Sequence, residues 1–523
     1  MHKPVIKLPL KKAVQQISLK KQVIFYIVVL FCLLPLKGLA QISYNPVSMG
    51  LGGGGTSYIN DYEALFINPA NLQLREKNYR LQFSFAESGA YIDTPLRITD
   101  WGDRFDTYTS LMQTSSATRF ALSHEDRESL LSRHFSNGRT SRQFTSTSTI
   151  NWLGVKWFSE ERSYAIAART RQGSRFTVGR GFYQDFISES GSVEQINRSL
   201  SHDFQTLHEL SFGYSESFSF LSGLFPRISR FIIGIAPKVV VSGSSFSTRY
   251  SNTYSREGND PWRNDSFYSF ESTGAFTEPA ERLLSGNEPF ANQAGISRLS
   301  EISSPTGIGG AIDLGITYIF TFGDDLSLIR RGVEPTEKSL RLSLSVTDLG
   351  AIYYFEDPLR AEWEEADSRV QNPGPLSDTF YAGALLQDFH FLSENGGHPL
   401  QSARSQDRDN YHSLLPTSLQ SGILFQINRI KVMGDFQLGL TENAFQSTKL
   451  TSYIGAEIRP LSFLPLRAGT RLATDLPGYY SFGAGIETRY FDLNAAVQFR
   501  STSAGPSLEP VAASVAALKF YIP

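Results

Sequence analysis

Apolar and polar residues alternate along much of the second half of the chain. Leu340 and Leu342 flank Arg341, and the same period of two returns at residues 430–441 and 491–500. Successive side chains of a β-strand point to opposite faces, so each of these segments has one apolar and one polar face. Two folds fit this pattern. In a soluble sandwich the apolar faces meet in a core, whereas in an outer-membrane barrel they face lipid and the polar faces line a lumen.

The alternation predicts an all-β chain, and as a transmembrane antiparallel barrel it would have roughly 14 to 16 strands, within the bacterial range. The expected strands include residues 118–123, 163–169, 175–182 and 380–386, besides clearer segments near the C-terminus. Residues 248–304 are polar and interrupted by prolines, so we expect a long loop there.

The links between the last predicted strands differ in length. Short turns such as residues 428–429 alternate with longer links such as residues 501–510, which is typical of barrels. With the C-terminus at the periplasmic end, this parity predicts an external loop at residues 387–417. It also predicts a periplasmic link at residues 351–378, with a short helix at residues 359–367. A periplasmic link of that length is unusual, so a strand hidden within it is the alternative.

The N-terminal region has the features of an export signal. A lysine-rich stretch precedes an apolar run at residues 23–36, and a cleavage site of small residues ends at Ala40. An apolar run of roughly 14 residues is short for a membrane anchor, which needs about 20, so we predict a secretory signal peptide at residues 1–40. Cleavage there removes Cys32, the only cysteine, so we expect no disulfide or thiolate metal site in the mature chain.

The composition fits an exported barrel better than a cytosolic enzyme. The 523 residues carry a formal net charge of -2, and 13% of them are aromatic. This charge provides no large basic field, so nucleic acid is not expected as a partner. Apart from the leader, no apolar run is long enough to cross a bilayer as a helix, whereas a closed barrel spans a membrane without such a run.

Aromatic residues cluster near the ends of predicted strands. In an outer-membrane barrel these positions form two interfacial girdles, whereas in a sandwich aromatic residues are ordinary strand formers. The pairs are Trp157 and Phe158, Phe320 and Phe322, Tyr479 and Tyr480, Tyr490 and Phe491, and Phe520 and Tyr521.

Few residues have the spacing of a catalytic or cofactor site. Gly50, Gly52 and Gly55 fit the glycine pattern of a dinucleotide loop, but no strand and helix flank them, so no cofactor is expected. His202 and His208 do not have the spacing of a metal pair, and no metal site is expected. No nucleophile elbow is present, so we expect no catalytic residues and no enzyme. An outer-membrane hydrolase is the remote alternative, because triads are recognised by geometry rather than order.

Charged residues lie on the polar faces of the predicted strands, among apolar neighbours. They carry both signs, so we expect them to pair across a lumen of low effective dielectric constant. Two interpretations remain open, namely a conduit or ligand site and structural ion pairing inside a plugged barrel. The lumen-facing candidates are Asp313, Arg341, Lys431, Asp435, Glu457, Arg467, Arg471, Glu487, Asp492 and Arg500.

Residues 44–74 are rich in glycine and asparagine and do not alternate, so we expect a terminal plug rather than wall. The glycine-rich residues 49–55, followed by an Asp, an Ala and the Asn-Pro-Ala sequence of residues 68–70, resemble the N-terminal signature of FadL-like outer-membrane barrels. The resemblance implies a barrel of about 14 strands whose N-terminal segment folds into the lumen as a hatch. The hatch candidates are Gly50, Gly52, Gly53, Asp61, Ala64, Phe66, Asn68, Pro69 and Ala70.

The FadL-like family includes transporters of long-chain fatty acids and hydrocarbons, and relatives associated with the type IX secretion system of Bacteroidota. Residues 311–315, 344–350 and 415–419 look like a Bacteroidota branch of unknown function. The motif match is specific for the fold and weak for the substrate. Transport of lipophilic molecules is therefore implied by the family resemblance and not by these residues.

The pattern and the resemblance together predict an outer-membrane β-barrel that binds or passes small hydrophobic molecules across the outer membrane. The alternative is a closed accessory or scaffold barrel for protein secretion or surface assembly. The expected partners are outer-membrane lipid, a hydrophobic small molecule and other secretion or envelope proteins. The expected organisation is a signal peptide at residues 1–40, a hatch or plug at residues 41–77 and the barrel at residues 78–523.

Overall fold

The structure is a computed structural model. It describes residues 45–74, 77–93, 140–159, 161–184, 195–218, 229–256, 261–278, 303–321, 338–370, 405–473, 478–501, 508–515 and 519–522, with short pieces at 119–120, 128, 131–132, 135, 187–188, 191–192 and 380–381. The predicted signal peptide lies outside the described residues. No described helix is long and apolar enough to cross a bilayer.

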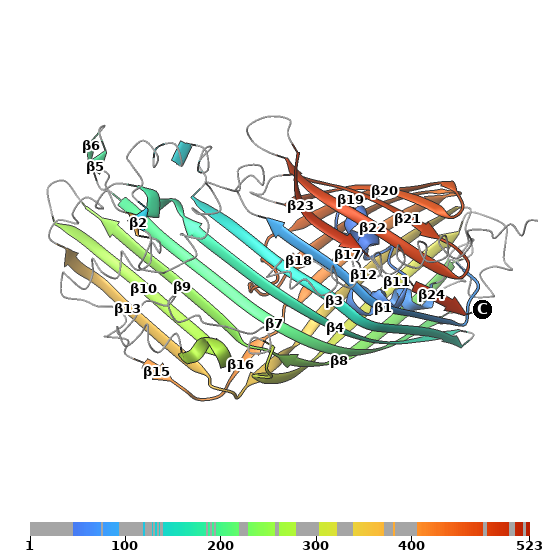
Figure 1. Cartoon of the computed structure of the whole chain (residues 1–523), viewed down its shortest axis with the longest axis horizontal. Coiled ribbons are helices and arrows are strands. Elements are labelled where there is room, and N and C mark those ends of the chain that lie inside the picture. Colours follow the sequence, from blue (N-terminus) through green and yellow to red (C-terminus); the bar gives the residue numbers. More distant parts are fainter. Residues whose placement is uncertain are drawn as a thin grey trace, which may run out of the picture. The chain divides into compact units, whose positions relative to one another are not determined.

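Strands at fourteen positions form a closed antiparallel ring (Figure 1). The wall strands are β1 (Leu81–Asp93), β3 (Ser141–Ser159), β4 (Arg162–Gly179), β7 (Gln195–Phe218), β8 (Ser229–Ser242), β11 (Gly307–Thr321), β12 (Lys338–Tyr354), β17 (Ser418–Ile427), β18 (Ile430–Gly439), β19 (Thr451–Leu461), β20 (Leu464–Ala473), β21 (Tyr479–Glu487), β22 (Phe491–Ser501) and, sharing the last position, β23 (Leu508–Val515) and β24 (Lys519–Ile522). The ring closes because β1 pairs with β3 on one side and with β23 and β24 on the other. The predicted barrel is confirmed.

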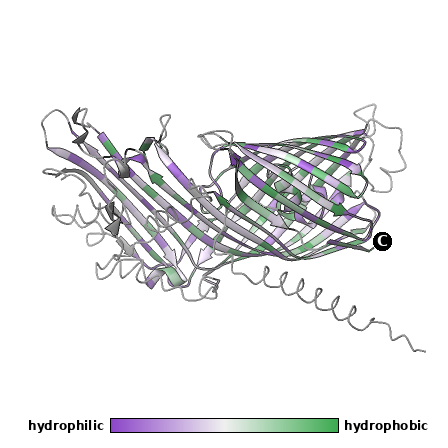
Figure 2. Cartoon of the chain, turned by 45° about the horizontal axis from the view of Figure 1, so that its top comes forward, coloured by the Kyte–Doolittle hydropathy of each residue, from purple (hydrophilic) through white to green (hydrophobic). Residues whose placement is uncertain are grey.

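The wall strands place apolar side chains outside and polar side chains inside. β12 pairs with β11 on one side and with β17 on the other. Its residues Leu342 and Leu344 are 41% and 45% exposed, whereas Arg341 on the same strand is fully buried. Figure 2 shows hydrophobic and hydrophilic residues alternating along these strands. A soluble sandwich would bury the leucines and expose the arginine. The exposed apolar face is therefore a lipid-facing wall, and the ring is a transmembrane β-barrel.

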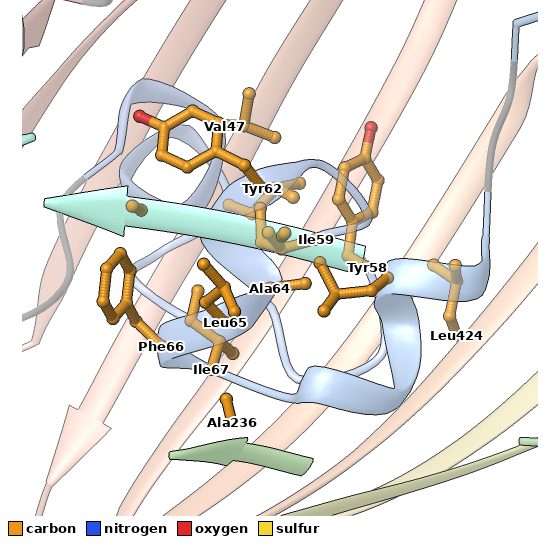
Figure 3. Packing of buried hydrophobic residues seen from close by; sticks show 14 of the residues in the cluster. Val47, Tyr58, Ile59, Tyr62, Ala64, Leu65, Phe66, Ile67, Ala236 and Leu424 are labelled. Atoms are coloured by element: carbon orange, nitrogen blue, oxygen red, sulfur yellow. The ribbon is translucent and has the colours of Figure 1, made fainter. Parts of the chain in front are cut away.

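Residues 45–74, which we call the N-terminal segment, lie inside this ring. The segment contains three short helices, α2 (Pro46–Gly50), η1 (Tyr62–Phe66) and η2 (Pro69–Gln73). Its apolar residues are buried and pack with wall residues such as Ala236 on β8 and Leu424 on β17 (Figure 3).

The three helices begin at residues that satisfy their backbone donors. The side chains of Asn45, Asp61 and Asn68 each accept a hydrogen bond from a backbone N–H in the first turn. α2 and η2 each begin with a proline. Proline is favoured at the first helical position, because the N–H that it lacks would have no partner within the helix. The starts of these three helices are therefore determined by residues of the segment itself.

A second sheet region continues from the wall. The second half of β7 pairs with β8, and its first half pairs with β9 (Ser245–Ser255). β10 (Trp262–Thr273) pairs with β9, and β13 (Leu359–Val370) pairs with β10. We call β9, β10, β13 and the first half of β7 the outer sheet. Figure 1 shows β9, β10 and β13 side by side. Two short strands, β15 (Ser405–Asp407) and β16 (Tyr411–Leu414), pair with β13 and β12.

The outer sheet corrects two predictions. The expected loop at residues 248–304 contains most of β9 and all of β10, and the expected helix at residues 359–367 lies within β13. Tyr250 and Tyr254 are buried at alternate positions of β9, where hydroxyl and aromatic residues replace the aliphatic residues of the membrane wall. In β13, pairing with β10 overrides the helix-forming composition of its alanine and glutamates.

The strand order also corrects the predicted parity. Residues 163–169 and 175–182 belong largely to one strand, β4, and the segment expected at residues 380–386 is not in the ring. Its described part, β14 (Phe380–Tyr381), pairs with β2 (Arg119–Phe120) outside the ring. β2 is the described part of the strand predicted at residues 118–123. The prediction placed one extra wall strand between β12 and β17, which pair directly with each other. Without that strand, the link after Tyr354 lies at the end of the barrel opposite the turn at residues 428–429, and not at the same end as predicted. That short-turn end corresponds to the periplasmic end of bacterial barrels, and we call the opposite end the loop end.

Candidate functional site

The N-terminal segment lies between two cavities of the barrel. The outer cavity, about 160 Å³, lies at the loop end, and its lining includes Gly439, Thr451 and, from the segment, Phe66. The inner cavity, about 50 Å³, lies at the short-turn end, and its lining includes Arg459 and, from the segment, Tyr58. The segment thus divides the interior between the two ends.

Asp435 binds the glycine-rich part of the segment. Its carboxylate, on β18, accepts backbone hydrogen bonds from Gly55 at 2.5 Å and from Thr56 at 2.8 Å. Two converging N–H donors suit a carboxylate, and bonds to a charged group are stronger than neutral ones. Gly52 and Gly53 have φ angles of 94° and 106°, which L-residues rarely adopt, so this turn requires glycine.

Asn68 joins the Asn-Pro-Ala sequence to the wall and to the rest of the segment. Its side-chain amide donates to the Thr56 carbonyl at 3.0 Å and to the Thr317 hydroxyl of β11 at 2.9 Å. The Ala70 carbonyl accepts a hydrogen bond from Ser215 of β7 at 2.8 Å. Pro69 and Ala70 begin η2, and Ala64 and Ala70 are fully buried.

Inward-facing glycines let the segment lie directly against the wall. A Cβ atom at Gly234 would overlap the backbone of Pro69 and Ala70, and one at Gly315 would overlap the Asn68 side chain. Gly50 packs against Gly483, where a Cβ added to Gly50 would lie 3.1 Å from the Gly483 Cα. Sequence reasoning missed this feature. The signal that could have found it is glycine at inward positions of several alternating strands. The other wall glycines that contact the segment are Gly154, Gly213, Gly422, Gly455 and Gly469.

A buried lysine holds the acidic end of the segment near the inner cavity. The ammonium group of Lys519 forms ion pairs with Asp61, with Glu63 at 3.2 Å and with Glu87 of β1 at 3.4 Å. The Tyr62 hydroxyl donates to the Glu87 carboxylate. Of these residues, only Asp61 is among the sequence candidates, because Lys519 and Glu87 lie in strands whose alternation is interrupted.

Arg467 is the centre of a second network at the short-turn end. Its guanidinium donates to Glu457 at 2.7 Å, to Glu487 at 2.6 Å and to Asn494 at 2.7 Å. The Tyr58 hydroxyl of the segment also donates to Glu457, at 2.5 Å. The predicted lumen residues Lys431, Glu457, Arg467 and Glu487 are therefore brought together, with Lys431 3.9 Å from Glu457.

Two further lumen candidates have different partners. Arg341 donates to the Ser57 carbonyl of the segment at 2.6 Å. Asp313 lies 2.6 Å from Lys238 of β8, which also pairs with Asp348 at 2.6 Å. Asp313 is thus compensated by a lysine of the neighbouring strand, whereas Arg341 donates to a backbone carbonyl of the segment.

The remaining candidates lie around tyrosines that point inward. Arg471 donates to the Tyr91 hydroxyl at 2.6 Å and its guanidinium lies 3.8 Å from the centre of the Tyr479 ring. Arg500 pairs with Asp93 at 2.6 Å. Asp492 pairs with Lys77 and accepts a hydrogen bond from Tyr521 at 2.6 Å.

The inward tyrosines correct part of the predicted girdle. Tyr479 and Tyr521 are buried, whereas Tyr480 and Tyr490 are exposed on the outside with Trp157. An aromatic pair on consecutive strand positions must send one ring to each face. Phe322 lies outside the described residues.

The histidines singled out from the sequence have ordinary polar partners. His202 lies 3.0 Å from the Ser174 hydroxyl, and His208 lies 2.9 Å from the Thr170 hydroxyl. Within the described part of the chain, no group of three or more His, Cys, Asp or Glu side chains is arranged to hold a metal ion.

The closed ring, its lipid-facing wall and its charged interior define an outer-membrane β-barrel protein. The chain belongs to a family of unknown function, DUF5723, whose pattern matches residues 104–497. No curated protein matches its sequence.

The chain is similar in structure to several solved bacterial channels. The toluene transporter TodX of P. putida has 10% sequence identity and a TM-score of 0.37, over 92% of this chain and 99% of that chain. The toluene transporter TbuX of Ralstonia pickettii has 12% identity and a TM-score of 0.39, over 92% and 99% of the two chains. The monoaromatic hydrocarbon channel CymD has 9% identity and a TM-score of 0.38, over 94% and 99%.

Proposed function

We propose that this barrel binds small hydrophobic molecules and passes them across the outer membrane, with the N-terminal segment as the gate. The observation that carries the proposal is the division of the interior into an outer and an inner cavity by this one segment. A solute that enters the outer cavity has to pass residues 45–74 before it reaches the inner cavity.

The backbone pairing of the wall is independent of the N-terminal segment, as a movable gate requires. The ring of strands closes through its own backbone pairing, and none of those pairs involves the N-terminal segment. The segment is held by side-chain hydrogen bonds and ion pairs, such as those of Asp435, Arg341 and Lys519. Displacing it would therefore break these polar contacts and its apolar packing against the wall, and would leave the backbone pairing of the wall intact.

The aromatic part of the outer cavity, whose lining is otherwise mostly polar, supports a solute with apolar surface. Phe66 and Tyr453 contribute aromatic rings from the segment and from β19, and Phe445 contributes a third from the turn after β18. The resemblance of residues 49–71 to FadL-like barrels agrees with such a solute and with a hatch. We therefore assign the hatch candidates to the gate. We assign Asp435, Arg341 and Glu457, which form hydrogen bonds with the segment, to holding it closed.

A reversible cross-link between the segment and the wall tests the gate. A Cβ atom built at Gly455 lies 2.9 Å from the Leu51 Cβ, so a small shift brings Leu51→Cys and Gly455→Cys into disulfide range. Purified protein in vesicles with a lipopolysaccharide outer leaflet would be assayed for uptake of radiolabelled toluene. We expect uptake to be lost on oxidation and restored on reduction, with the two single-cysteine variants unaffected by either treatment.

The other outcomes of this experiment are also informative. Equal uptake by the oxidised and reduced forms would show that the segment does not move during passage. No uptake by the unmodified protein would contradict the proposed transport and favour the closed scaffold barrel.

We further propose that residues 1–40 direct export and are removed after Ala40. The lysines followed by the apolar run at residues 23–36 support this proposal. The mass of the protein purified from outer membranes should match a chain that begins at Gln41. A mass that includes the leader would contradict it.

A further inference from the structure

An arginine ladder runs along the inward face of β4 into the outer cavity. Arg169, Arg171 and Arg175 occupy alternate inward positions, and Gly173 interrupts the series. All three arginines line the outer cavity and are only 4% exposed. A buried guanidinium requires a compensating acceptor, so the partners of each arginine determine what the cavity can bind.

The first two arginines of the ladder are neutralised within the protein. Arg169 pairs with Glu209 at 2.8 Å, and Arg171 pairs with Glu209 at 2.5 Å and with Asp348 at 2.9 Å. Each is also covered by an aromatic ring. Phe66 lies 3.8 Å from the Arg169 guanidinium, and Phe445 lies 5.0 Å from that of Arg171.

Arg175 is not compensated in this way. Among the described residues its one ion pair is a contact of 3.5 Å with Glu442, whose side chain is 56% exposed. The Nε atom of Arg175 is buried and has no hydrogen-bond partner within the described part of the chain. Its cross-strand neighbour on β7, Asp203, accepts a hydrogen bond from the Ser247 hydroxyl at 2.6 Å.

The acidic groups lining the outer cavity are already paired. Asp93 pairs with Arg500 at 2.6 Å, and Asp348 pairs with Arg171 at 2.9 Å and with Lys238 at 2.6 Å. Of the three arginines of the ladder, Arg175 is therefore the one that lines the cavity without a buried acidic partner among the described residues. A planar guanidinium matches a carboxylate, which accepts two parallel hydrogen bonds.

An aromatic ring lines the same cavity as Arg175. Phe445, in the turn after β18, is 3% exposed, and its ring fills the space left by the missing side chain of Gly173. Asn443 fixes this turn by accepting backbone hydrogen bonds from Phe445 at 2.9 Å and from Gln446 at 3.2 Å. Stacked or edge-to-face aromatic pairs are favourable, so the space beside Phe445 suits a flat ring.

We propose that the outer cavity binds monocyclic aromatic carboxylates, with the carboxylate on Arg175 and the ring against Phe445. The volume of about 160 Å³ fits one aromatic ring, since an engineered apolar cavity of about 150 Å³ in another protein holds benzene. The assignment rests on the proposed function, because it names the class of molecule that the barrel accepts.

Binding of benzoate to the purified protein in detergent, measured by calorimetry, tests the site. Benzamide and acetate are the matched ligands, because the first keeps the ring without the charge and the second keeps the charge without the ring. We expect benzoate to bind at least about tenfold more tightly than either, since a charge-assisted pair and a buried ring each add to affinity. This comparison needs no variant and therefore does not depend on the folding of one.

The variant Arg175→Gln should weaken benzoate binding about tenfold or more and leave benzamide binding unchanged. Arg162→Gln is the control, because Arg162 lies on the same strand, is 55% exposed and pairs with Glu216 away from the cavity. Equal affinities for benzoate and benzamide, or equal benzoate affinities in the Arg175 and Arg162 variants, would overturn the proposal.

Toluene uptake by the vesicles separates this inference from the proposed function. Passage of toluene without selective benzoate binding would leave the transport proposal intact and remove the carboxylate site. Selective benzoate binding without passage of either solute would keep the site and contradict transport.

Discussion

At the residue scale, the packing of the barrel interior depends on inward-facing glycines as much as on charged side chains. Gly315 on β11 lies against Asn68. A Cβ built at Gly310 on the same strand would make only an ordinary contact, 3.6 Å from the Lys238 carbonyl oxygen. Glycine at an inward position of a strand therefore marks close approach of another backbone.

Gly315→Ala should destabilise the protein, because the added methyl group overlaps the Asn68 side chain. We expect a loss of about 1–3 kcal/mol, the usual cost of overpacking. Gly310→Ala is the matched control and should have little effect. Thermal unfolding in detergent measures both, and equal midpoints would contradict the close contact.

Sequence alternation could identify inward charges such as Asp313 and Arg341, because orientation follows from position along a strand. It could not identify their partners. Lys238 pairs with Asp348, which is 110 residues away, and Arg341 donates to a backbone carbonyl of the segment. Such pairs depend on strand order and register, which no local pattern contains.

At the element scale, the membrane wall and the outer sheet follow the same period of two with different residues. Aliphatic outward positions made the wall strands recognisable, whereas the serine- and tyrosine-rich β9 and β10 resemble a loop in composition. The fold was therefore predictable where lipid requires apolar residues, and it was missed where water is the solvent on the outer face.

Leu342→Arg should impair membrane insertion, because Leu342 faces lipid on β12. The expected cost is about 2–4 kcal/mol near the bilayer midplane. Ser251→Arg, on the outward face of β9 beside the exposed Arg249, should insert normally. The heat-modifiable migration of the folded barrel in gels distinguishes the two. Equal insertion would contradict the membrane boundary inferred here.

At the scale of the whole molecule, the two ends of the barrel differ. The turns at residues 428–429 and 488–490 are short, whereas the outer sheet extends from the loop end. The usual asymmetry of bacterial barrels places the outer sheet outside the cell.

Single-cysteine variants test this orientation. Thr253→Cys on β9 should react with a membrane-impermeant maleimide on intact cells. Thr488→Cys, in the turn between β21 and β22, should react only after the outer membrane is permeabilised. Labelling of Thr488→Cys on intact cells would reverse the orientation.

The 24-residue strand β7 joins the outer sheet to the interior without a break. Its first half pairs with β9, and Gly213 in its second half touches Leu65 and Leu72 of the N-terminal segment. β7 is also paired with β4 from Leu200 to Glu216, so both halves of the strand are held in one ladder of backbone hydrogen bonds. One continuous strand thus joins the outer sheet to the wall that surrounds the N-terminal segment.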